Sequence, residues 1–243
     1  MRSHLMPAAL YAMSREPGAR NPNPVMVTRV TEVPTSRQIL AYLLCRQCEN
    51  RFNVGGEQYV MGLVNNGTNF PLLDRLNVGL PLQETSTLAM YSGPAVGVDV
   101  EKLAYFALSV FWRASVHRWY APHGGTLWNS LGRYEEPIRQ YLLGVAGFPV
   151  DVVVAVTACT DQASQGSFYT PCVVRGHMQP SLGMLARGIH FRLFFGPNIP
   201  QQIRGVCCLT SPRQPILKGS CHRISVHAFA HLHQSSRPSR ALR

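Results

Sequence analysis

A change in hydrophobic period constrains the fold of this chain more than any other feature of its sequence. Between Asp99, which suits a helix N-cap, and Trp119, apolar side chains recur every three or four residues, as on the buried face of a helix. A second helix is expected to begin near Pro137, because the fixed φ of proline fits a first helical turn. Farther on, a β-branched run at 150–156 and alternating residues at 189–195 predict strands.

Further strands are predicted at three places where apolar residues again dominate, namely 168–175, 203–209 and 224–229. Two helices that lead into these strands predict an α+β fold with a mostly antiparallel sheet over residues 99–233. Residues 1–75 form a separate segment, and the Gly-, Pro-, Ser- and Thr-rich stretch 76–98 is interpreted as a linker. Residues 234–243 contain arginines without an apolar period and are expected to form a loose basic tail.

The chain is strongly basic. Of its 243 residues, 46% are hydrophobic and 14% charged, which excludes a disordered polyelectrolyte. Its 23 Lys and Arg residues against 12 Asp and Glu give a formal net charge of +11, and only Lys102 and Lys218 are lysines. Such a charge attracts phosphate backbones and other anionic surfaces. Nucleic acid is therefore an expected partner, and a basic protein without any anionic partner is the alternative.

The sequence contains no candidate membrane helix, because its apolar stretches are much shorter than the roughly 20 residues that a bilayer requires. The apolar run at 5–13 is broken by Pro7 and lacks the small-residue cleavage pattern of a signal peptide. Seven cysteines are an odd number at low density, which is not typical of a disulfide framework. We therefore expect a cytoplasmic protein with reduced thiols and no membrane partner.

The sharpest local motif is the pair formed by Cys45 and Cys48. Two thiolates separated by two residues can bind one metal ion, because a tight turn directs both sulfur atoms to the same point. One such pair is half of a tetrahedral site, and the sequence has no second Cys-x-x-Cys. We expect a structural zinc ion here, with ordinary buried thiols and a redox pair as the alternatives.

Two segments together resemble the treble-clef layout of HNH-type zinc proteins. They are Ser-His-Leu-Met-Pro at residues 3–7 and Leu-Leu-Cys-Arg-Gln-Cys-Glu at residues 43–49, with a second glutamate at Glu57. More narrowly, they are similar to a group of uncharacterised bacterial proteins described as HNH-endonuclease-like. The resemblance covers residues 1–60, and Ala-Leu-Ser-Val-Phe-Trp-Arg at 107–113 extends it. The first Cys pair of that layout has no counterpart in this sequence.

The resemblance implies a metal-dependent endonuclease, and a non-catalytic zinc-stabilised binding module with a degenerate site is the alternative. In the nuclease, His4 is the general base toward water. Glu49 and Glu57, eight residues apart, share a helix face and hold Mg²⁺ or Mn²⁺. Arg46 and Arg51 contact phosphate. The competing interpretations are a free terminal histidine and a solvated acidic helix face.

Four other features of the sequence bear on the fold or on a possible site. Gly55-Gly56 is expected to weaken a continuous helix through the second glutamate. Tryptophans are interleaved with arginines at Trp112, Trp119, Trp128, Arg113, Arg118 and Arg133. They fit a helix packed on a sheet with arginines at its edge. The alternative is a surface that stacks on nucleic acid. Cys207-Cys208 lie in an apolar run and are expected in the core. A metal site at the C-terminal histidines is a weaker possibility.

Overall fold

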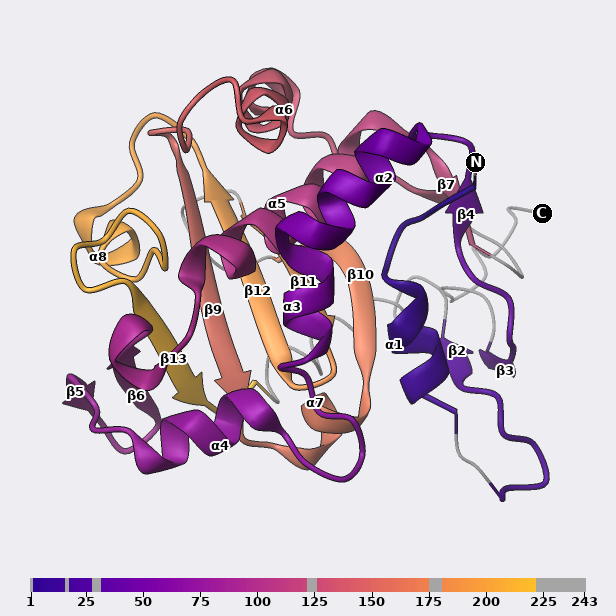
Figure 1. Ribbon diagram of the computed structural model, residues 1–243, viewed down its shortest axis with the longest axis horizontal. Helices are drawn as coiled ribbons and strands as arrows, with labels where there is room; N and C mark the ends of the chain where they lie inside the picture. The colour runs from indigo at the N-terminus through magenta and orange to yellow at the C-terminus, as the bar shows by residue number, and fades with distance from the viewer. Residues whose placement is uncertain (1, 16–17, 28–31, 122–125, 175–180, 222–243) are drawn as a thin grey trace, which may run out of the picture.

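The computed structural model describes residues 2–15, 18–27, 32–121, 126–174 and 181–221 (Figure 1). Within these residues the dominant feature is a seven-stranded sheet in the order β10-β11-β12-β9-β13-β6-β5. Neighbouring strands are antiparallel except for the parallel pair of β13 and β9. The strands are β5 (Gln83–Glu84), β6 (Leu88–Ser92), β9 (Val152–Cys159), β10 (Phe168–Val173), β11 (Ser181–Ala186), β12 (Ile189–Phe195) and β13 (Pro215–Gly219). The predicted α+β class with a mostly antiparallel sheet is confirmed.

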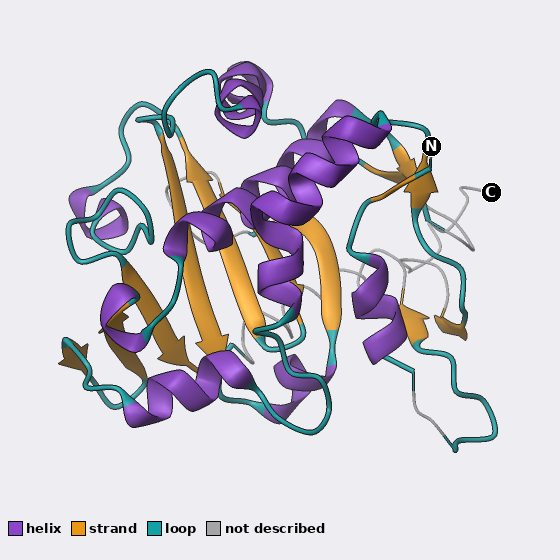
Figure 2. Ribbon diagram, viewed as in Figure 1, coloured by secondary structure: helices purple, strands orange, loops and turns teal. Residues whose placement is uncertain are grey.

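Helices lie across one face of this sheet and along its edges, as Figure 2 shows. They are α1 (Ala8–Met13), α2 (Arg46–Phe52), α3 (Gln58–Met61), α4 (Pro71–Val78), α5 (Val100–Val116), α6 (Glu135–Leu143), α7 (Gln162–Gly166) and α8 (Gln201–Arg204). Short strands form three further antiparallel pairs: β1 (Ser3–His4) with β4 (Leu40–Ala41), β2 (Val25–Val27) with β3 (Glu32–Pro34), and β7 (Trp119–Tyr120) with β8 (Thr126–Leu127).

Helix α5 is the central helix and follows its predicted period. The side chain of Asp99 caps it by accepting a hydrogen bond from the Lys102 backbone N–H at 3.1 Å. Its apolar face packs on the sheet, where the rings of Phe106 and Phe191 lie 5.3 Å apart. The helix ends at Val116, a few residues before its predicted end.

A second helical layer crosses α5, and it includes the glycine pair that was expected to weaken a helix. Helices α2 and α3 are joined by a π-helical turn, η1 (Asn53–Glu57), so the backbone stays helical from residue 46 to residue 61. An added Cβ at Gly56 would lie 2.6 Å from the Lys102 carbonyl oxygen, and one at Gly55 would lie 2.5 Å from the Tyr105 ring. The glycine pair interrupts the regular α-helix with a π-helical turn but does not end it, and the missing side chains allow the two helices to approach closely.

One core connects the segments that the sequence divides. Buried residues of the first segment, such as Leu10 and Val60, belong to the same cluster as Val154 and Phe191 of the sheet. The stretch interpreted as a linker, 76–98, contributes β5 and β6 to the sheet, where β6 pairs with β13. Its polar composition reflects an exposed sheet edge, since both residues of β5 are exposed.

Some strand predictions are wrong, and some lie outside the described residues. The predicted strand at 203–209 is instead α8 and a series of turns, in which the Cys208 N–H donates to the Val154 carbonyl at 2.8 Å. Cys207 and Cys208 are both fully buried, as expected of core residues. Strands β11 and β13 were not predicted, because β11 is buried on both faces and shows no alternation. The predicted strand at 224–229, the C-terminal histidines and the basic tail are outside the described residues.

A disulfide joins Cys159, at the end of β9, to Cys221, just after β13, with Cα atoms 5.4 Å apart. The expectation of reduced thiols is therefore wrong for these two residues. The remaining cysteines of the described residues are free thiols: Cys45, Cys48, Cys172, Cys207 and Cys208. The pairing joins neighbouring parallel strands that are distant in sequence, so local spacing does not reveal it.

Gly56→Ala is expected to destabilise the fold by about 1–3 kcal/mol, because the new methyl group overpacks the contact with α5. Alanine favours an ordinary helix over glycine, so this loss runs against intrinsic propensity. Urea unfolding followed by circular dichroism measures it. Gly147→Ala is the matched control, since an added Cβ there has no neighbour within 4 Å. Equal stability of the two variants would contradict the close helix contact.

Candidate functional site

The two thiols of the Cys-x-x-Cys motif lie together at the start of α2. Cys45 is the N-cap residue, and its Sγ accepts a hydrogen bond from the Cys48 N–H at 3.5 Å. Cys45 is exposed, whereas Cys48 is half-buried. The backbone hydrogen bond from Cys48 lowers the pKa of Cys45, and the hydrogen bond with the Cys45 thiol raises the pKa of Cys48. Thiolate character is therefore concentrated on the exposed sulfur atom.

This pair has no further ligand among the residues that the structure describes. In that part of the chain, no three His, Cys, Asp or Glu side chains come together as a metal ion would require. A tetrahedral zinc site at Cys45 and Cys48 therefore needs two ligands from outside the described residues. The hydrogen bond with Cys45 and burial raise the pKa of Cys48, and the positive charge of Arg51 offsets only part of this rise.

A buried arginine links two of the segments that carry the expected catalytic residues, through the main chain of His4 and the side chain of Glu57. Arg113 of α5 is 1% exposed. Its Nη1 donates to the His4 carbonyl oxygen at 2.7 Å, and its Nη2 lies 3.5 Å from Glu57 Oε2. Its Nε donates to the Ser109 carbonyl oxygen at 3.2 Å. One guanidinium thus contacts the first strand, the second helical layer and its own helix.

Glu49 also interacts electrostatically with the Arg113 guanidinium. Burial lowers the pKa of Arg113, and the negative charges of Glu57 and Glu49 oppose that shift. The Oε1 atom of Glu49 is buried and has no hydrogen-bond partner. Glu57 is thus partly neutralised by Arg113, and Glu49 retains an oxygen atom that is free to bind a donor or a cation.

Arg113 is buried, although its position among tryptophans and arginines predicts the edge of a helix. It was expected at the edge of a helix on a sheet, yet it is almost fully buried. The signal was present: Arg113 follows Phe106 by seven residues, so it lies on the same face of α5 as the apolar stripe. A charged residue within a buried stripe predicts a buried partner of opposite charge.

The two arginines expected to contact phosphate have different surroundings. Arg46 is exposed at the first residue of α2. Arg51 is also exposed, but its Nη1 donates to the Leu143 carbonyl oxygen at 2.6 Å and so ties α2 to the end of α6. A phosphate bound to Arg51 would therefore share its hydrogen-bond donors with the Leu143 carbonyl oxygen.

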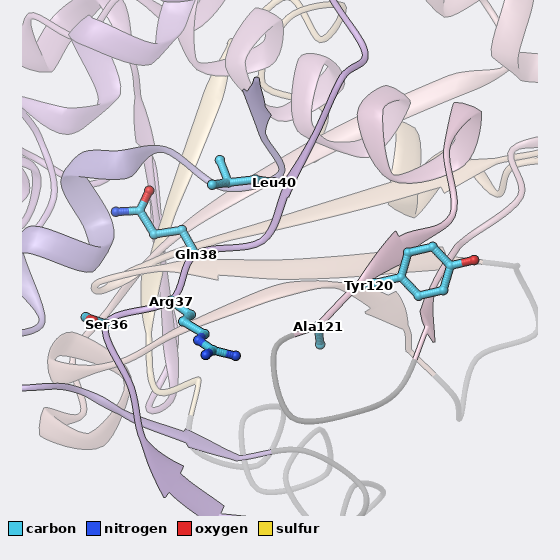
Figure 3. Close-up of a pocket in the computed structure, with 6 residues that line it drawn as sticks. All are labelled: Ser36, Arg37, Gln38, Leu40, Tyr120 and Ala121. Carbon is cyan, nitrogen blue, oxygen red and sulfur yellow. The ribbon is translucent and has the colours of Figure 1, made fainter. Parts of the chain in front are cut away.

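A cavity of about 530 Å³ that is wide open to solvent lies between the segment leading into β4 and the end of β7, and no sequence motif indicated it. Figure 3 shows Arg37 and Tyr120 on separate segments at the two sides of this cavity. Its lining is Ser36, Arg37, Gln38, Leu40, Tyr120 and Ala121. Leu40 stands directly opposite His4 in the β1–β4 pair, so both side chains project on the same face.

The antiparallel pair of β7 and β8 carries exposed aromatic side chains. Tyr120 is 72% exposed and Trp128 is 49% exposed. The Trp128 Nε1 donates to the Ser115 carbonyl oxygen at 2.7 Å, which fixes the ring, and the Arg118 guanidinium lies 5.5 Å from the ring centre. We call the cavity, with Arg37 and Tyr120 in its lining, the β4–β7 groove.

Comparison with protein-family models, with curated protein sequences and with solved structures finds no match for this chain. Among the described helices, none combines the length and apolar character that crossing a bilayer demands. The site is therefore interpreted from its own geometry.

Arg113→Leu is expected to destabilise the fold by about 3 kcal/mol or more, because it leaves Glu57 and two carbonyl oxygens without their donor. Urea unfolding measures the change. Arg139→Leu is the control, since Arg139 pairs with Glu136 on the exposed surface of α6, where such pairs contribute under about 1 kcal/mol. If the two variants lose the same stability, Arg113 does not hold the three segments together.

Proposed function

We propose that this chain is a nucleic-acid-directed protein that holds a phosphate backbone and unstacked bases in the β4–β7 groove. The observation that carries the proposal is the placement of Arg37 and the exposed Tyr120 around one cavity, next to the strand that bears His4. Arginine neutralises phosphate, and an exposed aromatic ring stacks on a base of any sequence. The net charge of +11 supports the same partner class by raising encounter rates.

We also propose that Cys45 and Cys48 bind zinc, in a knuckle of the HNH-like type, with ligands from outside the described residues. The support is the adjacency of the two sulfur atoms and the lowered pKa of Cys45, because a metal ligand is a thiolate. A redox-active dithiol uses the same geometry. Metal content distinguishes the two.

Within this proposal, the chain is a metal-dependent endonuclease with His4 as general base and Glu49 as the principal carboxylate ligand of Mg²⁺ or Mn²⁺. The unpartnered Oε1 of Glu49 supports that role. The alternative, a non-catalytic binding module, is supported by the pairing of Glu57 with Arg113. A carboxylate already paired with a cation is a weaker ligand for a second cation.

The binding proposal is tested with fluorescence anisotropy on a labelled single-stranded oligonucleotide, as DNA and as RNA. Tyr120→Ala is expected to raise the Kd by about fivefold or more, since each stacked base contributes about 1–3 kcal/mol. Arg37→Gln is expected to make the slope of log Kd against log salt concentration shallower by the amount that about one phosphate contact contributes. Arg139→Gln is the charge control, because it removes one exposed arginine of α6 that does not line the groove. Equal affinity of Tyr120→Ala and the wild type would overturn the groove assignment.

The same oligonucleotides, incubated with Mg²⁺ or Mn²⁺ and resolved on a gel, separate the enzyme from the binding module. Glu49→Gln and His4→Ala are expected to abolish cleavage while binding in the anisotropy assay remains. Binding without cleavage by the wild type would support the non-catalytic module.

The zinc proposal is tested by elemental analysis of the purified protein. About one zinc ion per chain is expected, or about one per two chains if a second copy completes the site. Cys45→Ser is expected to lose the metal and to lower the unfolding temperature, because ligand loss removes metal-linked folding energy. Cys172→Ser, at another free thiol, is the control. If the wild type contains no zinc and forms a Cys45–Cys48 disulfide on mild oxidation, the zinc proposal is overturned and the pair is a redox-active dithiol.

A further inference from the structure

The face of the sheet opposite α5 carries a polar cluster made of the buried His190 and the half-buried Tyr169 and Arg192. The Phe191 side chain contacts Phe106 of α5, so its neighbours along β12 project to the other side. Tyr169 lies two strands away, on β10, and its ring centre is 6.3 Å from that of His190. Three strands that are consecutive in the sheet therefore bring these side chains together.

All three side chains have a buried polar atom without a hydrogen-bond partner. These atoms are His190 Nε2, the Tyr169 hydroxyl and Arg192 Nε, and among the described residues only Glu49 and Trp112 also have such an atom. Buried polar groups in folded proteins are nearly always paired, because each unpaired group loses the hydrogen bonds it made with water. Three such atoms on one face of the sheet indicate that this face binds a partner that the described residues do not supply.

Gly183 of β11 shows where these groups converge. An added Cβ at this residue would lie 3.2 Å from His190 Nε2 and 3.6 Å from the Tyr169 hydroxyl. Gly183 is also the residue directly opposite Arg192 in the β11–β12 pair. The atom nearest to that added Cβ is Val174 Cγ2, at 2.7 Å, so the two unpaired groups and the Val174 side chain meet over Gly183, and a side chain at this residue would collide with them.

The charge of the cluster is positive and has no counter-charge in the part of the chain that the structure describes. Arg192 Nη2 donates to the Ser181 hydroxyl at 3.2 Å, and its guanidinium lies 4.7 Å from the centre of the Phe194 ring. Burial lowers the pKa of Arg192, and burial together with the charge of Arg192 lowers the pKa of His190 to about 3. His190 is therefore neutral near pH 7, and the arginine is the charge that remains to be balanced.

We propose that Tyr169, His190 and Arg192 bind a small oxyanion, namely a carboxylate or a phosphate group. Arg192 supplies the charge and a charge-assisted hydrogen bond, and the Tyr169 hydroxyl and the His190 Nε2–H supply neutral donors. Histidine nitrogen is also a common metal ligand, but a cation here would be repelled by Arg192. The site lies on the opposite face of the sheet from α5 and does not depend on the proposed nucleic-acid or zinc function.

The test is a titration of the full chain with inorganic phosphate and, separately, with acetate. Long-range ¹H–¹⁵N spectra of the imidazoles report on the site, and His190→Gln identifies the His190 signal. The His190 signal is expected to shift to saturation, and the anion with the lower Kd defines whether the ligand group is phosphate or carboxylate. Arg192→Gln is expected to raise that Kd by about tenfold or more. Arg139→Gln is expected to leave it within about twofold.

A His190 signal that does not respond to either anion, or that responds equally in Arg192→Gln, would overturn the proposal. Tyr169→Phe keeps the test valid if Arg192→Gln does not fold. Loss of its hydroxyl is expected to raise the Kd by about threefold or more, while the unfolding temperature without added anion stays unchanged, because this hydroxyl has no partner to lose. A lower unfolding temperature with an unchanged Kd would instead make Tyr169 a packing residue.

Discussion

The contact of Arg113 with three segments is the interaction on which the first half of the molecule depends. Its guanidinium donates hydrogen bonds to the His4 carbonyl of β1 and to the Ser109 carbonyl of its own helix, and it forms an ion pair with the Glu57 carboxylate of the second helical layer. A buried cation is tolerated only when its donors are paired, so the positions of these segments are linked to one another. The close contact at Gly56 completes this arrangement, because it brings the second layer within reach of α5.

The sheet separates two chemical environments. Its inner face is apolar and packs against α5 through residues such as Phe191. Its outer face carries Arg192, His190 and Tyr169, each with one buried polar atom that has no hydrogen-bond partner. The disulfide between Cys159 and Cys221 fastens the neighbouring strands β9 and β13. A rigid sheet with a polar cluster on its outer face is a suitable support for a binding site.

The proposed nucleic-acid surface and the proposed zinc pair are close in the chain, yet they use different chemistry. Arg37 and Tyr120 offer charge and a stacking ring at the β4–β7 groove. Cys45 and Cys48 offer soft ligands at the start of α2, four residues after β4 ends. The short connection means that metal binding at the proposed zinc pair would order a segment close in the chain to the proposed groove.

The sequence by itself determined the elements whose burial is periodic. The apolar stripe of α5, the valine-rich β9 and the alternating β12 were predicted at nearly their observed positions, and two residues of separation brought Cys45 and Cys48 together. Only the tertiary structure decided the pairing of Arg113 with Glu57, the cluster on β10, β11 and β12, and the parallel pairing of β13 with β9. The physical reason is that a local period records which face of an element is buried and not what that face is buried against.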